Sequence, residues 1–197
     1  MAKRLKDTLY EKIQDWRPRT ERLMKEYGDV VVDKVTISQI LGGMRGIVSL
    51  VSDISYLDPM EGIRYRGYTL PEVFEKLPKA KNSEMPTVES LFYLLLTGDI
   101  PNEEQASEVA DEFNKRRILP RYIYEVIDGM PCCSHPMTIF STAILTMHRE
   151  SFFTKKYHSG LQKADYWDPT YEDTLNLLAK LPEIATYIYA KLYRDGK

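Results

Sequence analysis

The sequence predicts a mainly α protein with many helices and one small antiparallel β element near residues 30–68. Three observations lead to this fold class. Apolar residues near the N-terminus recur at the spacing of one helical face. Residues 30–68 are rich in β-branched and aromatic side chains, with turn residues between them. From residue 69 onward, capping residues, prolines and glycines divide the chain into segments of helical length.

The first predicted helix lies near the N-terminus. Proline lacks the amide hydrogen that a helix interior uses, so Pro18 is expected to interrupt or kink this helix. The apolar spacing then resumes and stops at Gly28, a residue typical of helix C-termini. The residues that share one face, at positions i, i+4, i+8 and i+11, are Leu5, Leu9, Ile13 and Trp16.

The β element is predicted from four short runs separated by turn residues. Asp33-Lys34 and the segment 58–62 have compositions typical of turns, and residues 39–44 favour a short helical turn within the element. The candidate strands are Val30–Val32, Val35–Ile37, Ile47–Val51 and Ile63–Tyr68.

The remaining two-thirds of the chain is predicted to be helical. Thr69 with Glu72, and Asn102 with Gln105, have the spacing of capping boxes, and Thr87 is a further N-cap. Proline near the first turn fits three of the later helices. The predicted helices begin after Thr69, Thr87 and Asn102 and then cover residues 121–128, 136–149, the 150s, 169–180 and 182–194.

Composition excludes several classes of function. The net charge of −2 and the scattered basic residues give no reason to expect nucleic-acid binding. The longest apolar run, 91–96, is too short to span a membrane. Cys132 and Cys133 are adjacent, which suits neither a disulfide nor a complete zinc site, so we expect a reduced intracellular protein. The N-terminal residues resemble neither a signal peptide nor an organellar presequence.

No familiar catalytic motif is present. His135, His148 and His158 do not have metal-ligand spacing, and His135-Pro136 is interpreted as the lead-in to a helix. The chain contains no nucleophile elbow, P-loop or dinucleotide-binding glycine motif. The residues by themselves therefore specify no catalytic group and no metal site.

The segment Gly42-Gly43-Met44-Arg45-Gly46 has two interpretations. Glycine allows positive φ angles and arginine supplies a fixed fork of donors, a combination suited to a phosphate or a carboxylate. The alternative is that this segment and residues 57–67 are tight turns with solvent-exposed arginines.

Residues 136–149 also leave two alternatives open. Apolar or small side chains surround the predicted helix on all sides, which indicates burial on all sides. The helix could lie in the core of the chain or at a subunit interface.

As strings of residues, these segments resemble citrate synthase of the eukaryotic mitochondrial type. The resemblance covers essentially the whole chain, and its segments are long and occur in order. They are residues 42–46, 57–68 with Pro71-Glu72, 77–81, 97–101 with 103–105, 135–137, 166–167, 171–173, 178–182 and 192–194.

The resemblance implies a multi-helix large domain and the condensation of acetyl-CoA with oxaloacetate to citrate and free CoA. It implies no permanently bound cofactor, because acetyl-CoA and CoA are substrate and product. In the family, the catalytic histidines, the catalytic aspartate and the citrate-binding arginines lie in segments that do not occur in this sequence. Residues 1–197 are therefore expected to be the N-terminal part of the large domain, without the rest of that domain or the small domain, and to be inactive alone.

Two residues carry over from the family. Arg45 matches an arginine near the phosphates of CoA. Lys163 stands where the family has another CoA-phosphate arginine, and lysine keeps the charge but loses the bidentate fork. The resemblance also places the 136–149 helix in a homodimer interface and the protein in the mitochondrial matrix.

Two other functions compete with a citrate synthase segment. The chain could be a non-catalytic, truncated form that dimerises with full-length subunits. It could also belong to a methylcitrate synthase, a close relative that uses propionyl-CoA.

Overall fold

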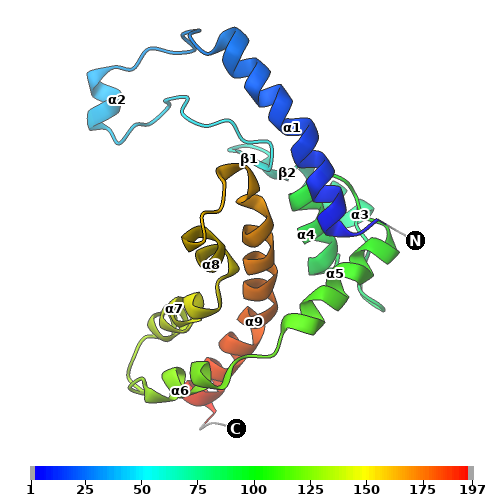
Figure 1. Cartoon of the computed structure of the whole chain (residues 1–197), viewed down its shortest axis with the longest axis vertical. Coiled ribbons are helices and arrows are strands. Elements are labelled where there is room, and N and C mark those ends of the chain that lie inside the picture. Colours follow the sequence, from blue (N-terminus) through cyan, green and yellow to red (C-terminus); the bar gives the residue numbers. More distant parts are fainter. Residues whose placement is uncertain (1–2, 195–197) are drawn as a thin grey trace. The chain divides into compact units, whose positions relative to one another are not determined.

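The computed structural model describes residues 3–194, which form two compact units divided after Val109. The fold is mainly α, as predicted, with a three-stranded antiparallel sheet (Figure 1). The α-helices are α1 (Leu5–Tyr27), α2 (Ile37–Leu41), α3 (Leu70–Lys76), α4 (Val88–Thr97), α5 (Glu103–Arg116), α6 (Arg121–Gly129), α7 (Pro136–Thr146), α8 (Phe152–His158) and α9 (Trp167–Tyr193). Two 3-10 helices, η1 (Met147–Glu150) and η2 (Lys163–Asp165), and strands β1 (Ser55–Asp58), β2 (Gly62–Tyr65) and β3 (Tyr68–Thr69) complete the described elements.

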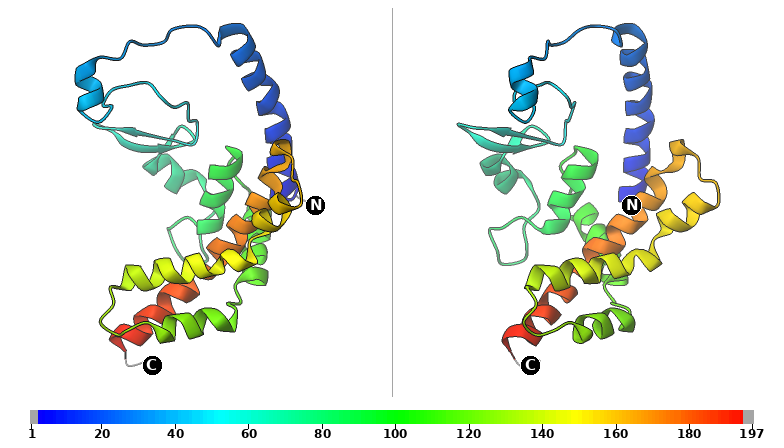
Figure 2. Two further views of the ribbon diagram at one scale, coloured as in Figure 1. Left: turned by 60° about the vertical axis from the view of Figure 1, so that its left-hand side comes forward. Right: turned by 90° about the vertical axis from the view of Figure 1, so that its left-hand side faces the viewer.

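Helix α1 runs through Pro18 without interruption and is the long blue helix of Figure 2. Its predicted apolar face is buried only at the first turns, where Leu5 is buried and α1 contacts α4. An ion pair joins the same two parts of the chain: Lys12 Nζ on α1 lies 2.8 Å from Oδ2 of Asp99, just after the end of α4. Farther along the helix, Trp16 is 46% exposed. The apolar face is therefore longer than the surface that covers it within this unit.

A small core holds α3, α4 and the sheet together. The reciprocal hydrogen bonds predicted for the two capping boxes are present at Thr69 with Glu72 and at Asn102 with Gln105. Thr87 caps α4 as predicted, and Gly98 ends that helix with a φ of 80°. The buried residues of this core are Val73, Leu77 and Leu94, with Tyr65, Tyr68, Leu91 and Ile100 packed against them.

The predicted strands at 30–32, 35–37 and 47–51 are wrong. The described sheet is confined to residues 55–69, where Arg66 and Gly67, both with positive φ, form a two-residue turn between β2 and β3. Residues 37–41 form α2 instead, with a capping box between Thr36 and Gln39. A strand needs a hydrogen-bonded partner, and nothing in the described chain pairs with the valine-rich runs.

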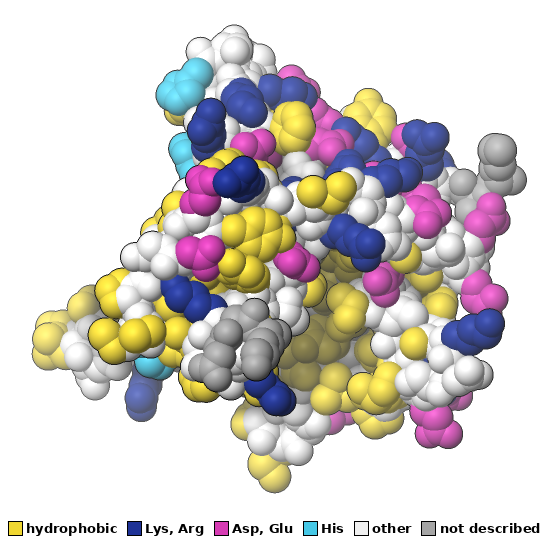
Figure 3. Space-filling model, turned by 90° about the horizontal axis from the view of Figure 1, so that it is seen from below, with side chains coloured by type: hydrophobic (Ala, Val, Ile, Leu, Met, Phe, Trp, Pro, Cys, Tyr) yellow, Lys and Arg dark blue, Asp and Glu magenta, His cyan; other side chains and the backbone are white. Residues whose placement is uncertain are grey.

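These unpaired runs leave many apolar side chains in solvent. Val31 is 77% exposed and Leu50 is 81% exposed. In the space-filling view of one face, hydrophobic side chains likewise reach the surface between charged ones (Figure 3). Exposed apolar surface of this extent is typical of a region that another polypeptide covers.

We expect the isolated 197-residue chain to self-associate through the exposed apolar side chains of residues 30–51, called here the apolar segment. Sedimentation velocity under reducing conditions should show species whose mass rises with concentration. The double variant Val31→Glu, Leu50→Glu should associate less, because charged side chains oppose the burial of the segment. A monodisperse monomer of the unmodified chain at high concentration would contradict this expectation.

The second unit is built around α6, α7 and α9. One continuous helix, α9, replaces the two predicted for residues 169–180 and 182–194, and it runs through Pro182. The proline lacks the backbone donor that would bond to the carbonyl four residues earlier, that of Leu178, and Leu178 lies at the surface. The core residues are Leu119, Ile123, Ile127, Ile139, Ala143, Met147, Ile184 and Ile188.

Polar contacts also tie α6 to α9. The ammonium of Lys191 donates to the carbonyls of Ile127, Asp128 and Met130, where α6 ends. The hydroxyl of Tyr187 donates to Asp128 at 2.9 Å, and this hydrogen bond raises the pKa of Tyr187. A cation at carbonyls of a helix C-terminus is favourable, so Lys191 stabilises the end of α6.

Helix α7 is buried on one side only within this unit. Ile139 and Ala143 are fully buried, whereas Leu145 is 74% exposed and Met137 is also exposed. The helix is shorter than predicted, because residues 147–150 continue it as the 3-10 helix η1. Of the two alternatives, the inner face serves the core of this unit, and the outer apolar face remains uncovered in the chain alone.

Candidate functional site

The glycine-rich segment directly follows α2. The backbone at Gly43 and Gly46 has positive φ angles of 80° and 68°, which glycine adopts without strain. The amide of Met44 donates to the carbonyl of Gln39 at 2.8 Å, and the side chain of Gln39 donates to the carbonyl of Arg45 at 3.5 Å. The turn that presents Arg45 is thus held by backbone geometry and by one glutamine.

The three arginines near this segment have different surroundings. Arg64 donates from Nε to Glu61 Oε2 at 2.8 Å and from Nη2 to Glu61 Oε1 at 2.6 Å. Its Nη1 donates to the carbonyl of Gly67 at 2.8 Å, and the hydrogen bond with Glu61 raises the pKa of Arg64. The Arg64 guanidinium is therefore occupied within its own hairpin.

Arg66 is occupied as well. Its Nε and Nη2 donate to the carbonyl of Leu95 at 2.9 and 2.7 Å, and its Nη1 lies 2.9 Å from Asp53 Oδ2. The side chain is only 15% exposed. Because Leu95 lies in the last turn of α4, Arg66 stabilises the C-terminal end of that helix.

Arg45 differs from both. Its side chain is exposed, and within residues 3–194 its guanidinium has no hydrogen bond or ion pair. A free guanidinium on a fixed turn can bind a phosphate or carboxylate through two parallel hydrogen bonds. Of the three arginines, Arg45 is the one available to an external anion.

Lys163 begins the 3-10 helix η2 in the second unit. Its side chain is exposed, and no partner of its ammonium lies within the described part of the chain. The neighbouring Lys156 is instead engaged by Asp168, with Nζ and Oδ2 2.5 Å apart. Lys163 thus offers a solvent-exposed positive charge.

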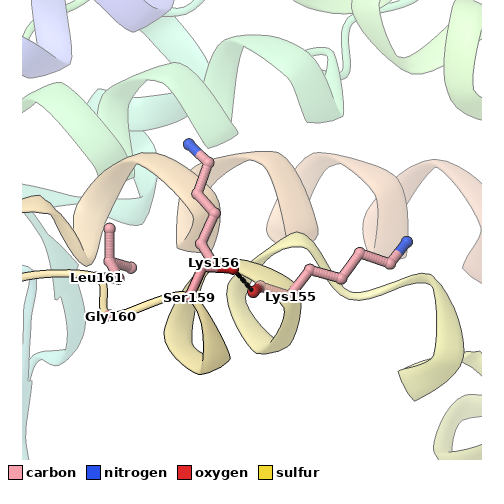
Figure 4. A pocket seen from close by; sticks show the side chains of 5 residues that line it. All are labelled: Lys155, Lys156, Ser159, Gly160 and Leu161. Atoms are coloured by element: carbon pink, nitrogen blue, oxygen red, sulfur yellow. Dashed lines mark hydrogen bonds between the residues drawn. The ribbon is translucent and has the colours of Figure 1, made fainter.

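The segment before Lys163 borders a shallow depression on the surface. Figure 4 shows Lys155 and Lys156 extending in different directions from α8. The hydroxyl of Ser159 donates to the carbonyl of Lys155 at 3.0 Å. Five residues line the depression: Lys155, Lys156, Ser159, Gly160 and Leu161.

Aromatic packing and one carboxylate hold α8 in place. The rings of Phe153 and Tyr166 meet edge to face, with centroids 5.1 Å apart. Asp173 of α9 accepts from the Ser151 hydroxyl at 2.7 Å and from the amides of Phe152 and Phe153 at 2.7 and 3.0 Å. A carboxylate at the N-terminus of a helix satisfies otherwise unpaired amides. Asp173 thereby anchors the segment that leads to Lys163.

Arg45 and Lys163 belong to different units, and each is placed only within its own. Asp173, Arg66 and Lys191 support the structure in ways that the sequence analysis missed. Their partners lie about 20 to 60 residues away in sequence, so spacing carries no signal for them. Lys180 was also missed, and burial lowers the pKa of its amine.

The three histidines have structural contacts. His135 is the N-cap of α7 and accepts at Nδ1 from the amide of Met137 at 3.2 Å, which confirms its interpretation as a helix lead-in. His148 Nε2 lies 3.1 Å from the Thr154 hydroxyl, and the His158 ring packs against Tyr157. Among residues 3–194, no three His, Cys, Asp or Glu side chains are grouped so that they could hold a metal ion. No helix of this part of the chain is long and apolar enough to cross a membrane.

The comparisons with known proteins all point to one family. A family model described as "Citrate synthase, C-terminal domain" matches residues 43–196. The mitochondrial citrate synthase of Aspergillus niger is 46% identical over 196 residues, which are 100% of this chain and 41% of that protein. That of Xiphias gladius is 45% identical over 192 residues, with 98% and 41% covered. The chain thus spans about 41% of the length of these relatives.

Solved structures show the same fold. The crystal structure of citrate synthase from Pyrobaculum aerophilum matches with a TM-score of 0.65 and 23% identity, over 85% of this chain and 40% of that one. A ternary complex of the Thermoplasma acidophilum citrate synthase with carboxymethyl coenzyme A and oxaloacetate matches with a TM-score of 0.60 and 16% identity, over 82% and 37%. Because the family model matches most of the described residues, the chain belongs to the citrate synthase family.

Proposed function

We propose that the chain is a segment of a citrate synthase subunit and contributes contacts to the phosphates of coenzyme A. The complete subunit would condense acetyl-CoA with oxaloacetate to give citrate and CoA. The observation that carries the proposal is the free guanidinium of Arg45 on a turn fixed by Gly43 and Gly46, in a chain of this family. The Thermoplasma acidophilum relative, crystallised with a coenzyme A analogue and oxaloacetate, supports the same substrates.

The two cations would act differently on the phosphates. Arg45 has a planar fork that can donate two hydrogen bonds to one phosphate group. Lys163 would act as a point charge, which attracts a phosphate without fixing its orientation. Neither residue takes part in bond making, so both should affect the binding of acetyl-CoA more than the rate of the chemical steps.

Removing the Arg45 guanidinium should raise KM for acetyl-CoA about 10- to 100-fold, because a charged hydrogen bond contributes about 1.5–3 kcal/mol. The measurement uses a chimeric subunit in which residues 1–197 replace the matched region of the Aspergillus niger relative. In this chimera, Arg45→Ala should raise KM while kcat changes little, and Arg45→Lys should have a smaller effect. Arg19→Ala is the matched control, because Arg19 is an exposed arginine paired with Asp15 on α1. An Arg45→Ala chimera with unchanged KM would refute this role.

Restoring an arginine at position 163 should improve binding. In the same chimera, Lys163→Arg should lower KM for acetyl-CoA severalfold, because it adds the bidentate fork, whereas Lys163→Ala should raise it. Parallel assays with 3′-dephospho-acetyl-CoA identify the phosphate involved. If Lys163→Arg and Lys163→Ala both leave KM unchanged, Lys163 is only a surface lysine.

A homodimer through the 136–149 helix is part of the proposal. The exposed apolar side chains of Met137 and Leu145 support it, since an uncovered apolar helix face is typical of an interface. The same face would let a non-catalytic short form pair with complete subunits, which is the second candidate function. We also place the protein in the mitochondrial matrix, supported by relatives that are named mitochondrial.

A further inference from the structure

Two neighbouring thiols lie in the connection between α6 and α7, and the proposed function uses neither of them. Cys132 and Cys133 are both free and both exposed. They are the only cysteines of the chain. A pair of accessible thiols on consecutive residues is a chemically distinct group, because one atom can bond to both sulfurs.

The thiols occupy the centre of a tight turn. The amide of Ser134 donates to the carbonyl of Pro131 at 3.0 Å, so Cys132 and Cys133 are the two middle residues of a β-turn. Helices fix both ends of this connection. The amide of Met130 donates to the carbonyl of Ile127 at the end of α6, and His135 caps the start of α7.

This geometry does not favour a disulfide between the two residues. Consecutive Cα atoms across a trans peptide are about 3.8 Å apart, and the described chain has no cis peptide. Disulfides usually join Cα atoms about 4.4–6.8 Å apart. A direct S–S bond would therefore have to distort the turn, whereas an atom placed between the sulfurs gives a longer bridge that the turn can accommodate.

The surroundings of the two thiols also restrict which element can bridge their sulfur atoms. Zinc prefers four nitrogen or sulfur ligands, and within residues 3–194 no third His, Cys, Asp or Glu joins the pair to form a metal group. Trivalent arsenic that carries an organic group needs only two sulfurs from the protein, because its third bond is already made. Its bonds are also bent, which suits two side chains on adjacent residues.

We propose that Cys132 and Cys133 form a dithiol site for trivalent organic arsenicals. With an arsine oxide, the two S–H bonds and the As=O bond break and two S–As bonds form. The two protons and the oxygen leave as one water molecule, and no atom is oxidised or reduced. The second S–As bond forms within the molecule, so its effective thiol concentration is high and the adduct resists competing monothiols.

The test uses phenylarsine oxide and the reduced 197-residue chain. Intact mass spectrometry should show one phenylarsenic group added per chain with loss of one water, and peptide mapping should place it on residues 132–133. Displacement by 2-mercaptoethanol should need a concentration about 100-fold higher for the unmodified chain than for Cys132→Ser or Cys133→Ser. The dithiol 1,2-ethanedithiol should remove the group readily. Because both side chains are exposed, circular dichroism should show the same helical content in each serine variant.

Several outcomes would overturn the proposal. Single serine variants that hold the arsenical as firmly as the unmodified chain would show that the second thiol is not used. An adduct mapped outside residues 132–133 would also reject it. Mild oxidation that rapidly removes two hydrogens from the monomer would show that the turn accommodates a direct disulfide, which would contradict the geometric argument for a bridging atom. None of these readouts involves coenzyme A, so they are independent of the proposed function.

Discussion

Residues 1–197 alone should form no citrate, even at saturating acetyl-CoA and oxaloacetate. Condensation requires a base for the acetyl methyl group and donors for the developing enolate oxygen, and the three histidines of the chain serve other contacts. Enzymes accelerate reactions by about 10⁶-fold or more, so a chain without such groups is expected to leave only the uncatalysed rate. The measurement is the release of CoA thiol, with the protein's own Cys132 and Cys133 blocked beforehand.

The chimera with the Aspergillus niger relative is the positive control for this assay. It contains the same 197 residues together with the remainder of a complete subunit, and it should turn over. A folded chimera that binds CoA but stays inactive would show that residues 1–197 are incompatible with catalysis. Turnover by the 197-residue chain itself would show that it holds catalytic groups that we have not identified. Assays of the chimera with propionyl-CoA would test the methylcitrate synthase alternative.

Local signals predicted most of the fold. Capping boxes such as Thr69 with Glu72 involve residues three positions apart, so they can be recognised in the sequence and are present in the structure. The strand predictions at 30–51 failed because a strand depends on a distant partner, and the valine-rich runs without one have no strand structure and are exposed. Pro182 misled the prediction for α9, because packing of Ile184 and Ile188 outweighs one lost backbone hydrogen bond.

The candidate site could be predicted only in part. Sequence resemblance selected Arg45, but spacing could not separate it from Arg64 and Arg66. That distinction depends on acceptors such as the carbonyl of Leu95, which lies 29 residues from Arg66. For Lys163, resemblance supplies the position, and the exposed ammonium is compatible with it. Asp173 and Lys191 likewise have partners that are distant in the sequence, so spacing could not identify them.

Replacing Asp173 by alanine should destabilise the second unit by about 2–3 kcal/mol. The carboxylate accepts three hydrogen bonds, from the hydroxyl of Ser151 and from the amides of Phe152 and Phe153. Loss of a helix cap costs about 0.5–2 kcal/mol, and a partly buried donor left without an acceptor adds to that cost. Asp173→Asn should lose less, because the amide keeps one oxygen as an acceptor but carries no charge.

The two tryptophans allow this effect to be assigned to one unit. Trp167 begins α9 in the second unit, and Trp16 lies on α1 in the first, so a Trp16→Phe background leaves Trp167 as the single tryptophan, which can be excited selectively over the tyrosines. Urea unfolding followed by Trp167 should then show the loss for Asp173→Ala. Thr174→Ala is the matched control: its hydroxyl donates to the carbonyl of Thr170, four residues earlier in α9, so its effect should stay within about 0.5 kcal/mol. Equal stabilities of Asp173→Ala and Thr174→Ala would mean that α8 does not depend on this carboxylate. A loss confined to Asp173→Ala would identify it as the anchor of the segment that carries Lys163.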